Sequence, residues 1–361
     1  MHWSFSIGRL FGSELRIHAT FFLLLAWIGT ATWLSDGLAA ALVSILFVLA
    51  LFSCVVAHEF GHALMARRYG VRTPDITLLP IGGMARLERI PENPREEIAV
   101  AVAGPAVNIA IWLVLVVIFG VQGNPSALFS LDEASQGFFE RLAAVNLFLV
   151  IFNMIPAFPM DGGRVFRAAL SGAVGRVRAT RIATHAGQLF AFLFGYLGLV
   201  SGNPILLLIA IFVFMAAMAE NSNVQLHGLM KGVMARDAMI TSFETLKPDD
   251  SLESAEMALL RTTQSEFPVL NIDGSLAGFL AKSEIIATHQ AGPRSEIVAD
   301  AMVKAIPIIK LTDPLDAALD NLQSSAVPAV AVTDHKGLFL GYVTRENIGE
   351  WAVLSGTTSR K

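Results

Sequence analysis

The feature that most constrains this chain is a series of long stretches without charged residues. They cover residues 17–35, 37–57, 98–131, 142–160 and 182–219. A helix needs about 20 apolar residues to cross the hydrocarbon core of a bilayer. The first four stretches each provide one crossing, and the fifth is divided into two by the break Ser201–Pro204. The sequence therefore predicts about six transmembrane helices.

Charge divides the chain into two parts. Residues 1–228 contain 27 charged groups with a net charge of +1, whereas residues 229–361 contain 29 with a net charge of −5. We therefore expect a transmembrane domain over 1–228 and a soluble domain over 229–361. With a single cysteine, an internal disulfide is impossible. The composition also argues against a disordered chain and against a nucleic-acid-binding protein.

Arginines in the loops predict the orientation in the membrane. Two alternate loops are basic, whereas the opposite loops together carry only Arg141. The positive-inside rule then predicts that the basic loops, both termini and the C-terminal domain are cytoplasmic, in a multi-pass protein of the cell membrane. The basic residues are Arg67, Arg68, Arg72, Arg86, Arg89 and Arg95 in one loop and Arg164, Arg167, Arg176, Arg178 and Arg181 in the other.

The second apolar stretch ends in the pattern H-E-x-x-H, formed by His58, Glu59 and His62. On a helix, two histidines four residues apart lie on one face and can bind the same zinc ion. Glu59 lies beside them and can accept a proton as a general base. Ionisable side chains near bilayer depth are costly without partners, so chance does not explain this pattern well.

A catalytic zinc usually has three protein ligands, and Asp161 is the candidate for the third. It follows 19 uncharged residues and two prolines, Pro156 and Pro159, which interrupt the helix. Irregular backbone at membrane depth is tolerated where it lines a cavity or is packed in protein. Asp161 and the histidines end two stretches that run in the same direction, so we expect them at similar depth.

These motifs resemble those of the site-2 proteases, which are zinc intramembrane metalloproteases, in the branch with C-terminal CBS domains. The matching segments are His58–His62, which carries HExxH, and Asn153–Arg164, which is similar to N-x-x-P-x-x-P-x-D-G-G. Segments 8–12 and 104–108 add support. Met160 stands where many members have leucine.

The resemblance implies one zinc per chain, held by His58, His62 and Asp161, with Glu59 as the catalytic base. It also implies that Asn153 helps to hold the substrate peptide or its oxyanion. The expected reaction is hydrolysis of a peptide bond in or near a transmembrane segment of another membrane protein, in regulated intramembrane proteolysis. Asn108 stays open between a site residue and a helix-packing residue.

Short β-prone pieces flank Gly82-Gly83 and predict a small β-hairpin. Its edge strand can pair with an unwound substrate segment, because a helix must open before its amide bond is attacked. A purely structural hairpin is the alternative.

The C-terminal domain contains two repeats, at about 233–292 and 296–356. Asp237-Ala238-Met239 recurs as Asp300-Ala301-Met302, and Gly278-Phe279-Leu280 corresponds to Gly341-Tyr342-Val343. Helices are expected over 251–261 and 314–323. The repeats resemble a tandem CBS pair, an α/β regulatory module that often binds adenosine nucleotides. Of the usual ribose contacts only Thr344 is present, so a nucleotide site and a ligand-free homodimerisation module both stay open.

The fold class is therefore a polytopic α-helical membrane domain with a small β-hairpin, followed by an α/β tandem CBS pair. Partners are the lipid bilayer and a membrane protein substrate. The main alternative function is a divalent-metal transporter with a cytoplasmic sensor domain, and a catalytically silent binding protein is a third. Against transport, Glu59 is the base that a hydrolase needs, and no ligand set repeats along a pathway.

Overall fold

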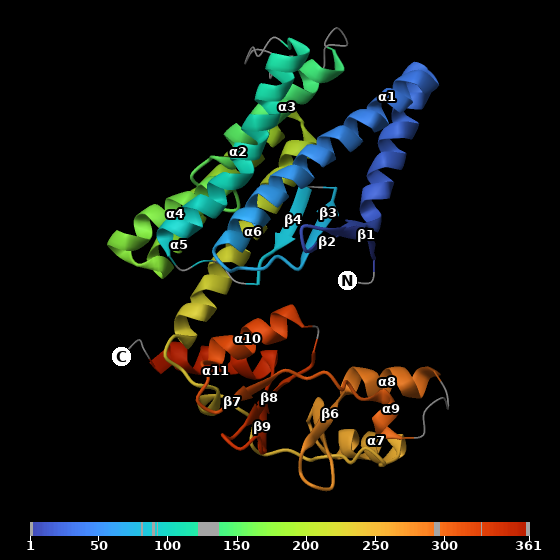
Figure 1. Ribbon diagram of the computed structural model, residues 1–361, viewed down its shortest axis with the longest axis vertical. Coiled ribbons are helices and arrows are strands. Elements are labelled where there is room, and N and C mark those ends of the chain that lie inside the picture. The colour runs from blue at the N-terminus through green and yellow to red at the C-terminus, as the bar shows by residue number, and fades with distance from the viewer. Residues whose placement is uncertain are drawn as a thin grey trace. The chain divides into compact units, whose positions relative to one another are not determined.

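The computed structural model describes residues 3–80, 82–88, 91, 93–121, 137–291, 297–325 and 327–358. Arg89, counted above among the loop arginines, and the end of the 98–131 stretch lie outside these residues. Contacts divide the chain into two units, Met1–Val224 and Gln225–Lys361 (Figure 1).

The first unit combines long apolar helices with one small sheet. Its elements are β1 (Ser4–Leu10), β2 (Ser13–His18), α1 (Ala19–Arg68), β3 (Asp75–Leu79), β4 (Gly82–Arg86), α2 (Pro94–Phe119), α3 (Phe138–Asn153), α4 (Asp161–Val174), α5 (Arg176–Ser201) and α6 (Pro204–Met230). In the described part of the chain, α1, α2, α5 and α6 are long and apolar enough to cross a membrane. The break near Ser201–Pro204 is confirmed, because α5 ends and α6 begins there.

Helix α1 is bent back on itself at Gly37, whose φ of 87° and ψ of 176° are not helical. The two halves form a hairpin, as Figure 1 shows. The ring centroids of Phe21, in the first half, and Phe52, in the second, are 4.6 Å apart. A Cβ at Gly29 would contact Ile45. The first two apolar stretches are thus two antiparallel helices, joined at Gly37 and together labelled α1. Only glycine readily adopts the backbone of residue 37.

The predicted hairpin around Gly82-Gly83 is confirmed as β3 and β4, but it belongs to a larger sheet. The strand order is β1-β2-β3-β4, with β2 and β3 parallel and the other pairs antiparallel. Strands β1 and β2 are absent from the sequence prediction. The sheet packs against α1 through β3 and β4, so β4 is an edge strand beside the H-E-x-x-H turn of that helix.

Helix α3 and the segment after it differ from the predicted fourth stretch. The helix begins at Phe138 and ends at Asn153, and residues 154–160 form an irregular segment before α4. This segment is held tightly: Phe158 N–H donates to the Ala183 carbonyl of α5, and a Cβ at Gly163 would clash with the Ala157 backbone. Asp161 is the first residue of α4 rather than part of the irregular segment.

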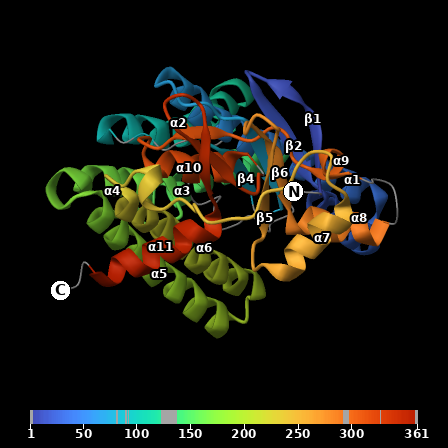
Figure 2. The ribbon, with the colours of Figure 1, turned by 90° about the horizontal axis from the view of Figure 1, so that it is seen from below.

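The second unit contains two similar halves. Its elements are a 3-10 turn (Ala235–Asp237), α7 (Leu252–Arg261), β5 (Glu266–Leu270), β6 (Leu276–Ala281), α8 (Lys282–Ala291), α9 (Val298–Ala301), β7 (Ile308–Lys310), α10 (Leu315–Ser324), β8 (Val330–Thr333), β9 (Phe339–Val343) and α11 (Arg345–Thr358). The two predicted amphipathic helices are confirmed as α7 and α10. Figures 1 and 2 show α7 and α8 together beside the β5–β6 hairpin, with which they share a buried core.

Each half of the second unit makes an equivalent contact with the other half. Ile240 of the first half bridges to Tyr342 of β9 in the second half, and Val303 of the second half bridges to Phe279 of β6 in the first. These two pairs are related by the same offset of 63 residues that relates the sequence repeats. The Phe279 and Tyr342 rings meet at 5.3 Å in the shared core. The repeat in the sequence is therefore a repeat in the packing.

Candidate metal centre

His58 and His62 lie on the second half of α1, one turn apart and both buried. Their Nε2 atoms are 3.0 Å apart. Helical periodicity at a spacing of four residues brings the two rings to the same side of the helix.

Helix α2 fixes the orientation of both rings. His62 Nδ1 is 2.7 Å from the Val100 carbonyl oxygen, and His58 Nδ1 is 3.1 Å from Oδ1 of Asn108. A carbonyl oxygen only accepts, so each Nδ1 is the donor, and each Nε2 is the nitrogen that faces the other ring. Such second partners usually set the tautomer of metal-binding histidines. The side chain of Asn108 is fully buried, and its Nδ2 has no partner among the described residues.

Asp161 is brought to the same point by the start of α4. Its Oδ2 lies 3.3 Å from Nε2 of His58 and 3.2 Å from Nε2 of His62. The three side chains form a group whose ligand atoms all lie within 4.8 Å of one another. The structure thus joins residues that are about 100 positions apart in the sequence.

The spacing of these atoms fits zinc. Ligand atoms that surround a tetrahedral zinc at about 2.0–2.2 Å lie ~3.3–3.5 Å from one another. The three measured distances of 3.0, 3.2 and 3.3 Å are close to this triangle. Two neutral imidazoles and one carboxylate are also a donor set that zinc takes in hydrolases.

Gly104 of α2 leaves the room for the two rings. A Cβ at this position would lie 2.7 Å from Nε2 of His58 and still closer to Nε2 of His62. Any other residue would place an atom against the Nε2 nitrogens of the two histidines. The close approach of α2 to the site therefore requires glycine here.

Glu59 lies between the histidine turn and the edge of the sheet. The backbone of Ala85 in β4 hydrogen-bonds to its carboxylate. A Cβ at Gly83 would lie 2.6 Å from Cγ of Glu59, so β4 approaches this side chain closely. The carboxylate is therefore held beside the three metal-binding candidates and beside β4.

Two other predicted residues are placed differently. Asn153 is the last residue of α3 and is half-buried, one irregular segment away from Asp161. In the second unit, Thr344 is buried, and its hydroxyl accepts the Asn347 N–H at the start of α11. Thr344 thus acts as a helix cap in this structure.

Sequence reasoning did not identify the supporting residues on α2. Val100 acts through its backbone carbonyl, which no residue type reveals. Gly104 stood in a supporting motif without a stated role, and Asn108 was left open. The spacing of residues 100, 104 and 108 along one helix face was the available signal.

Comparisons with known proteins match each of the two units to a family. Residues 46–135 and 129–194 match Peptidase family M50, and residues 235–289 and 298–352 match the CBS domain. The chain is 34% identical to a zinc metalloprotease of Methanocaldococcus jannaschii, over 87% of this chain and 86% of the relative. It is 28% identical to the putative zinc metalloprotease Rip3 of Mycobacterium tuberculosis, over 95% and 91% of the two chains. The solved site-2 protease of Methanocaldococcus jannaschii is 33% identical and covers 61% of this chain and 95% of its own, with a TM-score of 0.47.

Proposed function

Because the chain belongs to peptidase family M50, the site-2 protease family of intramembrane zinc metalloproteases, we propose that His58, His62 and Asp161 hold its catalytic zinc. The observation that carries this proposal is the triangle of two Nε2 atoms and one carboxylate oxygen, 3.0–3.3 Å apart, with both Nδ1 atoms engaged elsewhere. The alternative of a divalent-metal transporter has no support, because the relatives described above are named as metalloproteases.

Glu59 is the proposed general base and acid. When bound at this site, zinc supplies a Lewis acid that polarises an oxygen and makes water a nucleophile near neutral pH. Glu59 then accepts a proton from the attacking water and returns it to the nitrogen of the broken peptide bond. Its hydrogen bond to the Ala85 backbone supports this role, since it keeps the carboxylate beside the ligand triangle.

Asn153 is the proposed donor to the substrate oxyanion. Its side-chain N–H groups can stabilise the negative charge that develops on the carbonyl oxygen during attack. Support comes from its position at the end of α3, where the segment that leads to Asp161 begins.

The edge strand β4 is the proposed binding site for the extended substrate. Of the described strands only β3 pairs with it, and Glu59 lies against Gly83 and Ala85. A substrate strand added to this edge would pass close to the catalytic base.

Six membrane crossings are proposed, with the basic loops, both termini and the second unit in the cytoplasm. The two halves of α1 provide two crossings, and α2, α3, α5 and α6 provide one each. The arginine asymmetry of the loops supports this orientation.

The second unit, proposed as residues 229–361, is a regulatory CBS pair. Its two halves, joined through Phe279 and Tyr342, match the CBS domain. Homodimerisation and binding of an adenosine nucleotide near Thr344 are the two proposed modes of regulation.

Replacement of Glu59 by glutamine tests the catalytic proposal. Glu59→Gln keeps the size and most hydrogen bonds but removes the proton acceptor, so turnover of a reconstituted membrane substrate should fall about 10²–10⁴-fold with zinc retained. Glu88→Gln, at an exposed acidic residue, is the control. Unchanged cleavage by Glu59→Gln would contradict the mechanism.

A further inference from the structure

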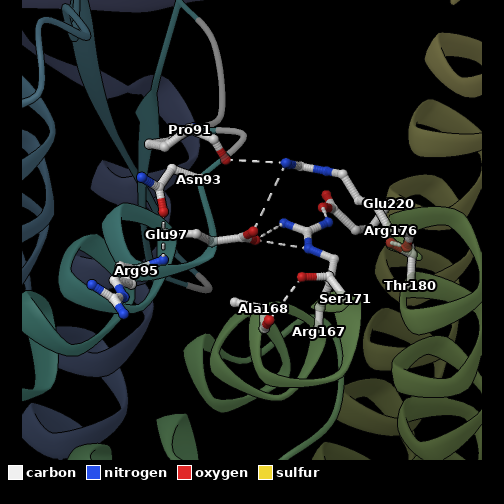
Figure 3. A network of polar contacts seen from close by, with 10 residues as sticks. All are labelled: Pro91, Asn93, Arg95, Glu97, Arg167, Ala168, Ser171, Arg176, Thr180 and Glu220. Carbon is white, nitrogen blue, oxygen red and sulfur yellow. Dashed lines mark hydrogen bonds and ion pairs between the residues drawn. The ribbon is translucent and has the colours of Figure 1, made fainter. Parts of the chain in front are cut away.

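Arg167 is the largest fully buried side chain among the described residues, and its guanidinium is enclosed by carboxylates. Its Nε and Nη2 donate to Oε1 of Glu97 at 2.7 and 2.5 Å, and Nη1 donates to Oε1 of Glu220 at 2.5 Å. Figure 3 shows this guanidinium between the two carboxylates, with Arg176 also close to Glu97. One side chain of α4 thereby joins α2 and α6.

The Glu97 side of this network leads directly to the histidines. Residues 97, 100, 104 and 108 recur at helical spacing on one face of α2, and all four are buried. Val100 and Asn108 hold the Nδ1 atoms of His62 and His58. The helix face that orients both rings is therefore the face that binds Arg167.

The other side of the network leads to Asp161. Arg167 lies six residues after Asp161 on the same helix, about 9 Å along its axis. Its guanidinium also covers the ring of Phe158, at 4.9 Å from the centroid, in the irregular segment that leads to Asp161. Arg167 thus contacts this segment and anchors the helix that begins with Asp161.

We propose that Arg167 is a positioning residue of the metal site. By binding Glu97, it fixes α4 and its Asp161 against α2, which holds His58 and His62. This inference rests on the proposed zinc site. It adds the side chain that keeps Asp161, the third ligand, at a fixed position relative to the two histidines.

Stability alone is a weak explanation for this network. A buried ion pair is often no more stabilising than packed apolar residues, because the charges lose their hydration. A fixed distance between α2 and α4 is a better explanation, because each zinc ligand has to lie within a few tenths of an ångström of its ideal distance from the metal. Arginine suits this role, since its planar group binds Glu97 through two N–H groups and leaves a third for Glu220.

The test compares two carboxylates that share the same guanidinium. Glu97 lies on the helix that contacts the histidines, whereas Glu220 lies on α6, which provides none of the three proposed ligands. Full-length Glu97→Gln and Glu220→Gln are purified in detergent. Zinc affinity is measured by chelator competition, and ligand geometry by the absorption spectrum of the cobalt-substituted protein.

We expect Glu97→Gln to weaken zinc binding about 10–100-fold, the usual effect of removing an outer partner of a metal site. Its cobalt spectrum should also change, while Glu220→Gln keeps both properties of the wild type. Arg167→Lys retains the positive charge but loses the planar group with several N–H donors, so it should show the same two changes as Glu97→Gln. It serves as the second test if Glu97→Gln folds poorly. Arg178→Lys, at an exposed position of α5, is the control for purification and assay.

Wild-type affinity and spectrum in both Glu97→Gln and Arg167→Lys would overturn the inference. Equal weakening in Glu97→Gln and Glu220→Gln would also overturn it, because that pattern follows general stability rather than the α2–α4 connection. Failure of the wild-type protein to bind zinc would instead contradict the proposed metal site itself, so the two failures are distinguishable.

Discussion

The Nε2 atoms of His58 and His62 face each other at 3.0 Å, and each ring is oriented by an oxygen that accepts a hydrogen bond from its Nδ1. Because both Nδ1 atoms face these oxygens, the two Nε2 atoms and the carboxylate of Asp161 are left to face one another. Three such ligand atoms within reach of one another can hold a single cation. The site is therefore complementary to a metal ion.

Gly104→Ala tests the space for the rings. The added Cβ would overlap both Nε2 atoms, and α2 is too tightly packed to retreat without loss of its contacts to α1. We expect zinc binding and proteolysis to be lost, as measured by metal content and substrate cleavage. Gly172→Ala, on α4 with open space around it, is the matched control and should keep both activities. A Gly104→Ala protein with normal zinc content would contradict the described packing.

Cross-linking tests whether substrate pairs with β4. A cysteine at Met84, which is 44% exposed, is introduced in a Cys54→Ala, Glu59→Gln background. Single cysteines are then moved along the cleaved region of a membrane substrate. A strand added to β4 should cross-link at every second substrate position, since side chains alternate along strands. A repeat of three to four positions would instead indicate a bound helix.

The stability of the second unit should depend on pH through Glu266. Burial, and then repulsion from Glu346, raises the pKa of Glu266 above its ordinary value of 4.5. The Tyr342 phenol nearby has a pKa raised to about 12, first by burial and then by Glu266. The folded unit therefore holds the Glu266 proton more tightly than the unfolded chain does. Ionisation of Glu266 thus lowers the free energy of unfolding of the second unit as the pH rises above 4.5. Below pH 4.5 the carboxyl group is protonated in both the folded and the unfolded chain, so it does not reduce stability.

Glu266→Gln should consequently stabilise residues 229–361 at pH 7 and leave their stability nearly unchanged at pH 4. Denaturant unfolding at the two pH values measures this difference. The exposed Glu253→Gln is the control. A glutamine variant that is less stable than wild type at pH 7 would show that the Glu266 charge is favourable in the fold.

Nucleotide binding to the second unit should depend on Thr344. We expect isolated residues 229–361 to form a soluble dimer and to bind AMP or ATP only as tightly as one hydroxyl contact allows. Loss of such a hydrogen bond corresponds to up to about tenfold in affinity, which calorimetry of Thr344→Ala would reveal. Thr333→Ala, at another buried hydroxyl, serves as the control. Micromolar binding that is unaffected by Thr344→Ala would contradict this interpretation of the site.

The sequence was most informative where chemistry depends on residue type. Ionisable residues at the ends of apolar stretches are costly, so His58, His62 and Asp161 could be selected before the structure was known, and the structure brings them together. Glu59 was selected in the same way, and it lies beside them. The repeats of the second unit could also be recognised, because equivalent positions such as Phe279 and Tyr342 fill equivalent places in its core.

The rest depends on backbone and long-range packing, which local patterns do not encode. Strand β2 pairs in parallel with β3 of the predicted hairpin through residues that are about 60 positions apart, and β1 pairs with the other edge of β2. The Val100 carbonyl orients His62 whatever the side chain is. The pairing of Arg167 with Glu97 spans 70 positions, and on the sequence each residue resembles an ordinary charge of a loop.

Metal content tests the central claim most directly. Purified wild-type protein and Glu59→Gln should each contain one zinc per chain, whereas Asp161→Ala and His58→Ala should lose it, because two ligands bind zinc far more weakly than three. Arg178→Ala should retain the metal. Elemental analysis of these proteins at equal concentration gives the answer. Stoichiometric zinc together with full activity in Asp161→Ala would contradict the assignment of the third ligand.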